Sequence, residues 1–170
     1  MEDNYDISKL KKKKKVNSRT KGASFERQIA TMLNKRFNTK EFSRTPGSGA
    51  FATTHNLPEH LKLHGDLITP KNFRYCIECK KGYNKENLYS LYNYRSDFWK
   101  FILQCQKDSD LSKKVPMVIF KQDRQKTLVI VPSYITYSIK KYIEIHKEEN
   151  SYKVYYLDDL LKEEDYHWFD

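Results

Sequence analysis

Three stretches of the chain carry apolar residues at the spacing of an amphipathic helix. The first is expected to begin near Ala23 or Ser24, where the Ser24 hydroxyl can cap the amino end. Its apolar positions are Phe25, Ile29, Met32, Leu33 and Phe37. Those of the second are Leu91, Tyr94, Phe98, Phe101, Ile102 and Cys105, and those of the third are Ile135, Ile139, Tyr142 and Ile143. Each stretch predicts a helix that turns one face toward a core.

Shorter apolar runs predict strands between and after these helices. They cover residues 75–80, 115–120, 127–131 and 151–157, and a brief run opens at Asp66. A polar turn around Asp123 and Arg124 joins the second and third runs, and residues 158–162 predict a short acidic helix. This order of elements predicts an α/β fold with a central mixed sheet flanked by helices.

The charge pattern divides the chain into a tail and one folded domain. Residues 11–15 are an unbroken lysine run, and like charges repel, so residues 1–20 are predicted to be a flexible basic tail. The remainder, 21–170, is long enough for a single domain with its own core. We divide it into a motif core, 21–131, and a carboxy-terminal extension of helix and strand, 132–170.

The net charge of +10 is unevenly distributed. Residues 1–21 carry +5 and residues 144–170 carry −6, so the segment between them carries +11. A strongly basic region favours a polyanionic partner, because it attracts phosphate and releases counterions on binding. We therefore expect a nucleic acid as the partner; the alternative is a merely soluble basic protein.

The sequence also favours a cytoplasmic protein. It has no apolar run of about 18 residues and no apolar stretch of a secretory signal near its start, so we expect neither a membrane span nor secretion. Three cysteines, an odd number, indicate a reducing compartment. Nuclear import directed by the lysine run is the alternative interpretation.

Three ionisable residues carry the strongest chemical signal: Asp66, Glu78 and Lys80. Side chains two apart in a strand share a face, so Glu78 and Lys80 point the same way. If the runs at Asp66 and at 75–80 pair as neighbouring strands, all three residues meet. Two carboxylates bind a hard divalent cation, and an ammonium group can orient water or stabilise charge on a phosphate. The set predicts metal-dependent phosphodiester hydrolysis, and a solvated strand face is the alternative.

Other features add less. Residues 42–51 contain two glycines and a proline, and Arg44, Thr45 and Ser48 can donate to phosphate oxygens there, although a plain loop would look similar. Cys76 and Cys79 are three apart, so in a strand their sulfurs face opposite sides and cannot share zinc. The histidines at positions 60 and 64 are expected in a loop near the substrate. No aromatic pattern is typical of a platform for stacking single strands.

Four motifs in order resemble the PD-(D/E)XK nuclease superfamily. They are Lys21-Gly22-x-x-Phe25-Glu26-Arg27, Arg44-x-x-Gly47-Ser48-Gly49, Gly65-Asp66 and Ile77-Glu78-Cys79-Lys80, and the resemblance covers roughly residues 21–131. Within the superfamily the chain is most similar to the archaeal-type Holliday junction resolvases and their bacteriophage relatives. The proline that gives the superfamily its name is Gly65 here, and glycine can also bend a chain.

The resemblance implies a role for each motif residue. Asp66 and Glu78 would bind Mg²⁺, for which Mn²⁺ would substitute, with the main-chain carbonyl of Cys79 completing the site and Glu26 helping to hold the metal or its water. Lys80 would position or activate the attacking water, and Ser48 would support cleavage. The implied DNA-binding residues are Lys21, Arg27, Arg44, Thr45, Gly47, Ser48 and Lys81.

The resemblance also implies the biological setting. Our first hypothesis is a homodimeric, Mg²⁺-dependent endonuclease that resolves Holliday junctions by paired symmetric nicks, in DNA recombination and repair. Its substrate would be branched or double-stranded DNA in the cytoplasm of a bacterial or archaeal host, and the bacteriophage relatives make a virus one candidate source. The alternatives are a restriction-type or general viral DNA nuclease on the same fold, and a non-catalytic basic protein that binds nucleic acid.

Overall fold

The computed structural model describes residues 17–46 and 64–170. In chain order the elements are α1 (Ser18–Arg36), β1 (Ser43–Arg44), β2 (Leu67–Ile68), β3 (Tyr75–Lys81), α3 (Leu88–Tyr92), α4 (Phe98–Ser112), β4 (Val115–Lys121), β5 (Leu128–Pro132), β6 (Ile143–Lys147), β7 (Asn150–Tyr156), α5 (Leu157–Leu160) and the short 3₁₀ helix η3 (Asp165–His167). No helix in this described part is long and apolar enough to cross a membrane.

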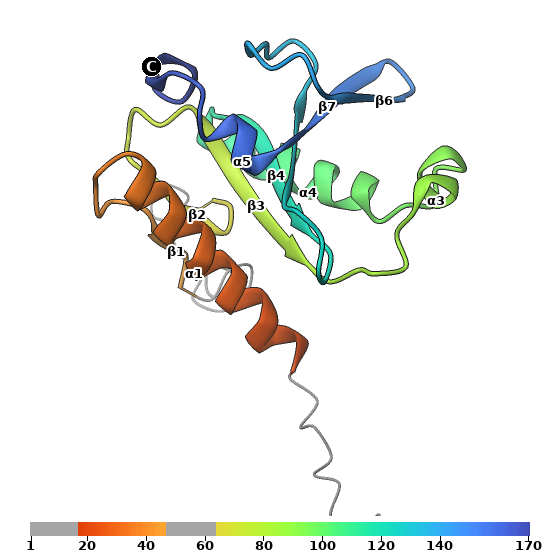
Figure 1. Ribbon diagram of the computed structural model, residues 1–170, viewed down its shortest axis with the longest axis horizontal. Coiled ribbons are helices and arrows are strands. Elements are labelled where there is room, and N and C mark those ends of the chain that lie inside the picture. Colours follow the sequence, from red (N-terminus) through yellow and green to blue (C-terminus); the bar gives the residue numbers. More distant parts are fainter. Residues whose placement is uncertain (1–16, 47–63) are drawn as a thin grey trace, which may run out of the picture.

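The central sheet has five strands in the order β3-β4-β5-β7-β6. Strands β3 and β4 run parallel, and the other neighbours are antiparallel, so the sheet is mixed. Helix α1 packs on one face of the sheet and α4 on the other, while β1 and β2 form a small separate ribbon beside β3 (Figure 1). This arrangement confirms the predicted α/β fold.

Two clusters of buried side chains lie on the two faces of the sheet. The α1-face core joins α1 to inward residues of the strands and to the carboxy-terminal segment, with Phe25, Ile77, Met117, Val129 and Trp168 among its members. The α4-face core is smaller and joins α4 to the opposite side of β4 and β5. Because successive residues of a strand face opposite sides, each central strand contributes to both cores.

Helix α1 begins earlier than its apolar spacing suggests. It starts at Ser18, and the side chain of Asn17 caps it by accepting a hydrogen bond of 3.1 Å from the main-chain nitrogen of Arg19. The predicted start near Ala23 or Ser24, with Ser24 as the cap, is wrong because a capped polar turn precedes the apolar stripe. The stripe itself is confirmed, since its predicted members are buried or packed against the α1-face core.

The second predicted helix is two helices. Helix α3 ends at Tyr92, and Tyr94 adopts a left-handed φ of 55° before α4 begins at Phe98. Tyr94, predicted in the buried stripe, is instead 58% exposed. The break falls in the run Asn93 to Asp97, whose polar groups bond locally rather than continuing a helix.

The third predicted helix does not form. Residues 135–142 follow β5 as irregular chain, and Ile143 begins β6. Ile135, Tyr137 and Ile139 pack against the α1-face core, while the residues between them are exposed. This is the two-residue alternation of extended chain. Ile135 and Ile139 are four apart, a spacing that fits both a helix and an extended segment. The predicted strands 115–120, 127–131 and 151–157 and the short acidic helix after them are confirmed.

Candidate active site

Strand β3 places its ionisable residues on one face and its apolar residues on the other. Tyr75, Ile77 and Cys79 enter the α1-face core. Glu78 and Lys80 point to the opposite side, where they form an ion pair. The Lys80 ammonium also donates to the side-chain oxygen of Gln104 on α4, at 3.2 Å. Glu78 is therefore only 1% exposed, and its partner Lys80 lies on the same face of the strand.

Asp66 reaches the same strand from the loop before β2. Its main-chain nitrogen donates to the carbonyl of Ile77 at 2.8 Å. Its carboxylate oxygen Oδ2 accepts from the main-chain nitrogen of Cys79 at 2.7 Å. Since β3 is an edge strand of the sheet, these main-chain groups are available to Asp66. The carboxylate is thus fixed beside Glu78. Strand β2 itself pairs with β1 and not with β3, so the three residues meet without that strand pairing.

Gly65 explains how Asp66 comes so close to β3. Its φ is +76°, and a Cβ atom at this position would lie 2.8 Å from the carbonyl oxygen of Ile77. Proline holds φ near −65° and could not adopt this conformation. The glycine that replaces the proline of the superfamily motif is therefore required by the local backbone.

The electrostatics of the pair suit a cation site. Burial, and next the nearby charge of Asp66, raise the pKa of Glu78 to about 8, and Lys80 offsets part of this effect. Burial lowers the pKa of Lys80, but the charge and hydrogen bond of Glu78 outweigh it and raise that pKa overall. Two buried carboxylates that repel each other would be stabilised by a divalent cation with oxygen preference.

Glu26 and Arg44 form a second ion pair beside this site. Glu26 lies on the buried side of α1 and is 7% exposed, and Arg44 reaches it from β1. Burial raises the pKa of the Cys79 thiol, and the charges of Asp66, Glu78 and Glu26 add to that effect. In the described ranges, however, no three His, Cys, Asp or Glu residues are grouped closely enough to hold a metal ion.

A site built here would therefore rest on two carboxylates. Asp66 and Glu78 are hard oxygen ligands of the type that Mg²⁺ uses, together with waters and substrate phosphate. The main-chain carbonyl of Cys79 lies on the same short stretch of β3. Glu26, paired with Arg44, belongs to the surroundings of the carboxylates, and its role toward a metal stays a prediction.

The remaining predicted residues have different environments. Lys21 and Arg27 are exposed on α1, and the Lys81 ammonium lies 5.7 Å from the ring of Phe25. Thr45 is buried, and its contact with DNA stays a prediction. Gly47 and Ser48 lie outside the described residues, as does the histidine at position 60. Gln104, which contacts Lys80, carried no sequence signal, because its position is an exposed site on a helix.

The geometry agrees with comparisons to known proteins. A family model described as "Phage putative PDDEXK endonuclease" matches residues 17–167. Protein D14 of Escherichia phage T5 is 35% identical over 124 residues, which are 69% of this chain and 72% of D14. No solved structure matches. The resemblance to the PD-(D/E)XK superfamily and to phage relatives is thereby confirmed, and the chain belongs to this phage PD-(D/E)XK endonuclease family.

Proposed function

We propose that the protein is a Mg²⁺-dependent endodeoxyribonuclease whose active site is formed by Asp66, Glu78 and Lys80. The observation that carries the proposal is the convergence of these residues at β3: the Asp66 carboxylate is held by the Cys79 main chain, and Glu78 is buried against Lys80. Membership of an endonuclease family supports the reaction class. PD-(D/E)XK nucleases generally use divalent metals, and the two carboxylates are suitable ligands.

The roles follow from the positions of the side chains. Asp66 and Glu78, with the main-chain carbonyl of Cys79, would hold the metal. When bound, the metal lowers the pKa of a coordinated water and neutralises charge on the scissile phosphate. The Lys80 ammonium, on the same face as Glu78, would orient the attacking water and stabilise negative charge as the water oxygen bonds to phosphorus. The ester bond to the departing deoxyribose oxygen then breaks; the attacking water releases a proton to solvent, and the departing oxygen takes up a proton from solvent.

The substrate proposal rests on charge and on the resemblance. The segment 22–143, which contains the site, carries +11, as expected for a protein that binds a nucleic-acid backbone. We propose DNA as the partner and a four-way junction as the preferred form. A symmetric homodimer would supply two copies of the site to a two-fold substrate, so that each copy nicks one strand. The cytoplasm of a phage-infected cell is the proposed location.

Cleavage of a panel of labelled DNAs tests this function. Four-way junction, flap and linear duplex of equal length are incubated with the protein in Mg²⁺, Mn²⁺ or EDTA. We expect two symmetric nicks in the junction with either metal, weaker cleavage of the others, and none in EDTA. Equal cleavage of all three DNAs would instead indicate a general or restriction-type nuclease, and binding without any cleavage would favour a non-catalytic DNA-binding protein.

Sedimentation of the same samples tests the dimer. We expect a two-fold assembly across micromolar concentrations, alone or on the junction. A monomer that makes both nicks at low concentration would contradict it.

A further inference from the structure

Residues 83–97, between β3 and α4, form a segment that we call the tyrosine arm. Its helix, α3, contains no buried residue and lies at one end of the molecule, away from α1 (Figure 1). The large apolar side chains that the arm exposes are Tyr83 (43%), Leu88 (76%), Tyr89 (80%), Tyr92 (81%) and Tyr94 (58%). Single exposed apolar residues are ordinary, but five in one short segment indicate a contact surface.

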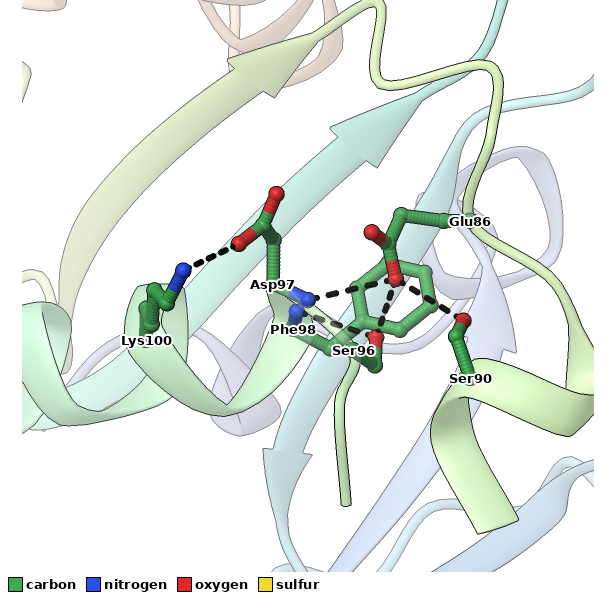
Figure 2. Close-up of polar contacts among 6 residues, drawn as sticks. All are labelled: Glu86, Ser90, Ser96, Asp97, Phe98 and Lys100. Carbon is green, nitrogen blue, oxygen red and sulfur yellow. Dashed lines mark hydrogen bonds and ion pairs between the residues drawn. The ribbon is translucent and has the colours of Figure 1, made fainter. Parts of the chain in front are cut away.

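Glu86 holds the arm in a defined conformation. Its carboxylate oxygen Oε2 accepts hydrogen bonds from the hydroxyls of Ser90 and Ser96, at 3.2 and 2.5 Å, and from the main-chain nitrogen of Asp97 at 3.2 Å. Figure 2 shows these bonds converging from α3 and from the start of α4. The network ties the exposed helix to the body of the protein and adds to the packing of Leu91, which is half-buried against the α4-face core.

A second set of bonds joins the arm to the turn after β4. The side-chain nitrogen of Gln122 donates to the carbonyls of Tyr83 and Glu86, at 3.1 and 2.9 Å. Asn84 and Asp123 exchange two hydrogen bonds of 2.9 Å each. These bonds fix the backbone of the arm, and a segment that is ordered in advance loses less entropy when a ligand binds. The arm is thus a braced element that displays its rings to a partner.

The arm carries two basic and two acidic residues, and the basic pair is the more exposed. Its exposed charged residues include Lys85 and Arg95. Its two acidic residues are occupied internally, since Glu86 accepts the bonds described above and Asp97 pairs with Lys100 at 2.7 Å. Aromatic rings next to cationic side chains, without exposed unpaired acid, are the combination that binds nucleic-acid bases and phosphates together.

The arm is also continuous with the candidate active site. The ring of Tyr83 contacts that of Phe101, with 4.7 Å between centroids, and the Lys80 ammonium lies 5.5 Å from the same Phe101 ring. Only Lys81 and Gly82 separate Lys80 from the arm in the chain. A DNA strand whose phosphate lies at Lys80 would therefore pass close to Tyr83, where the arm begins.

We propose that the tyrosine arm binds base faces that become exposed where DNA strands branch or separate, with Tyr89 and Tyr92 as the stacking residues. These two are three apart on α3 and so share one side of the helix. Stacking needs an unstacked base, so the arm selects branched DNA over continuous duplex. This inference rests on the proposed function, because it takes DNA as the substrate of the adjacent site.

The test compares binding of the full-length protein to three DNAs in EDTA, where no cleavage occurs. The DNAs are a four-way junction, a fork with unpaired arms and a linear duplex. We expect Tyr89→Ala/Tyr92→Ala to weaken binding to the junction and the fork about tenfold or more, and binding to duplex less than twofold. Tyr89→Phe/Tyr92→Phe retains both rings and should bind as the unchanged protein does. The fluorescence of a 2-aminopurine base at the branch should be quenched when the unchanged protein or the phenylalanine variant binds. It should stay unquenched when the alanine variant binds.

The control is Tyr134→Ala/Tyr166→Ala, which removes two rings that are 70% and 64% exposed elsewhere on the surface. It should bind all three DNAs normally. The proposal is overturned if the arm variant binds branched DNA normally, if it loses duplex binding equally, or if its only change is dissociation of a dimer. Binding in EDTA and cleavage in Mg²⁺ test the two proposals separately. Normal binding of branched DNA by the arm variant overturns the role of the arm alone. If the unchanged protein binds branched DNA through the tyrosines but never cuts it in Mg²⁺, the nuclease assignment alone is overturned.

Discussion

The candidate active site and the tyrosine arm lie on either side of Gly82 and depart from ordinary burial in opposite directions. The site buries charge: Asp66 and Glu78 are 7% and 1% exposed. The arm exposes rings: Tyr89 and Tyr92 are 80% and 81% exposed. Folding alone favours neither arrangement, because a buried charge loses hydration and an exposed ring gains no burial.

Each arrangement is held in place by hydrogen bonds that do little else. The Cys79 main chain orients Asp66, and Glu86 ties α3 to the start of α4. A bound partner would offset both unfavourable arrangements. A cation would neutralise the buried carboxylates, and a base would cover the exposed rings. Under our two proposals, the site would cut DNA at the buried charges and the arm would hold DNA at the exposed rings.

Substitutions at Asp66 should give the largest effect and separate its chemical task from its structural one. Asp66→Ala should reduce cleavage on the order of 10³-fold and lower the free energy of unfolding by about 1–3 kcal/mol, because the Cys79 nitrogen loses its acceptor. Asp66→Asn retains an acceptor and should lose cleavage but little stability. Single-turnover cleavage and urea unfolding measure the two quantities. Equal stability losses in both variants would show that the Cys79 bond is not what Asp66 contributes.

Gly65→Ala should test whether the site depends on close backbone approach. A side chain at φ +76° is strained, and its Cβ would overlap the Ile77 carbonyl, so we expect a loss of about 2–4 kcal/mol in unfolding free energy. The matched control is Gly22→Ala in α1, where the added Cβ would meet only Glu26 Oε1 at 3.8 Å. That variant should be stabilised by about 0.5–1 kcal/mol. Similar behaviour of the two variants would contradict the close approach.

Glu86→Ala should loosen the arm and leave the site intact. Removing the carboxylate leaves the Asp97 nitrogen and two hydroxyls without this acceptor, which we expect to cost about 1–2 kcal/mol of local stability. Hydrogen exchange of residues 86–98 should become faster, while exchange in β3 should not change. Glu41→Ala, at an exposed position, is the control. Unchanged exchange in the arm would mean that other contacts hold it.

Deleting residues 1–16 should have the smallest effect on DNA binding and cleavage. It should change neither the candidate active site nor the tyrosine arm. The deletion removes six lysines but keeps Asn17, the cap of α1. DNA affinity should fall with a flatter salt dependence, by up to about one unit of slope for each phosphate that the tail neutralises, while the positions of the nicks stay the same. A plot of the logarithm of the binding constant against the logarithm of the salt concentration measures this. An unchanged slope would show that the tail does not bind DNA.

The sequence predicted the parts of the fold that depend on local pattern. Alternation in residues 75–80 placed Glu78 and Lys80 on one face, and the structure pairs them. It also placed Cys76 and Cys79 on opposite faces, which the structure confirms: Cys79 lies in the α1-face core, and the Cys76 side chain lies beside Ser112 of α4. Period-two and period-3.6 patterns act through neighbouring residues, so they can be read without the fold.

The rest depended on contacts between distant segments. The bonds between Asp66 and β3 join segments that are apart in the sequence, and they depend on the left-handed conformation of Gly65. No local pattern reveals either feature. Tyr94 matched a helical stripe, yet the polar run before Asp97 ended α3 and turned the tyrosine outward. Ile139 matched another helix, but alternation beside the α1-face core made that segment extended.

The most direct test of the central claim is single-turnover nicking of a four-way junction by Glu78→Gln over a range of Mg²⁺ concentrations. The control is Glu144→Gln, which changes an exposed carboxylate on β6, at the opposite edge of the sheet from β3. We predict that Glu78→Gln binds the junction normally but nicks it on the order of 10³-fold more slowly, and that Glu144→Gln nicks at the unchanged rate. Nicking by Glu78→Gln at the unchanged rate would contradict the assignment of the active site.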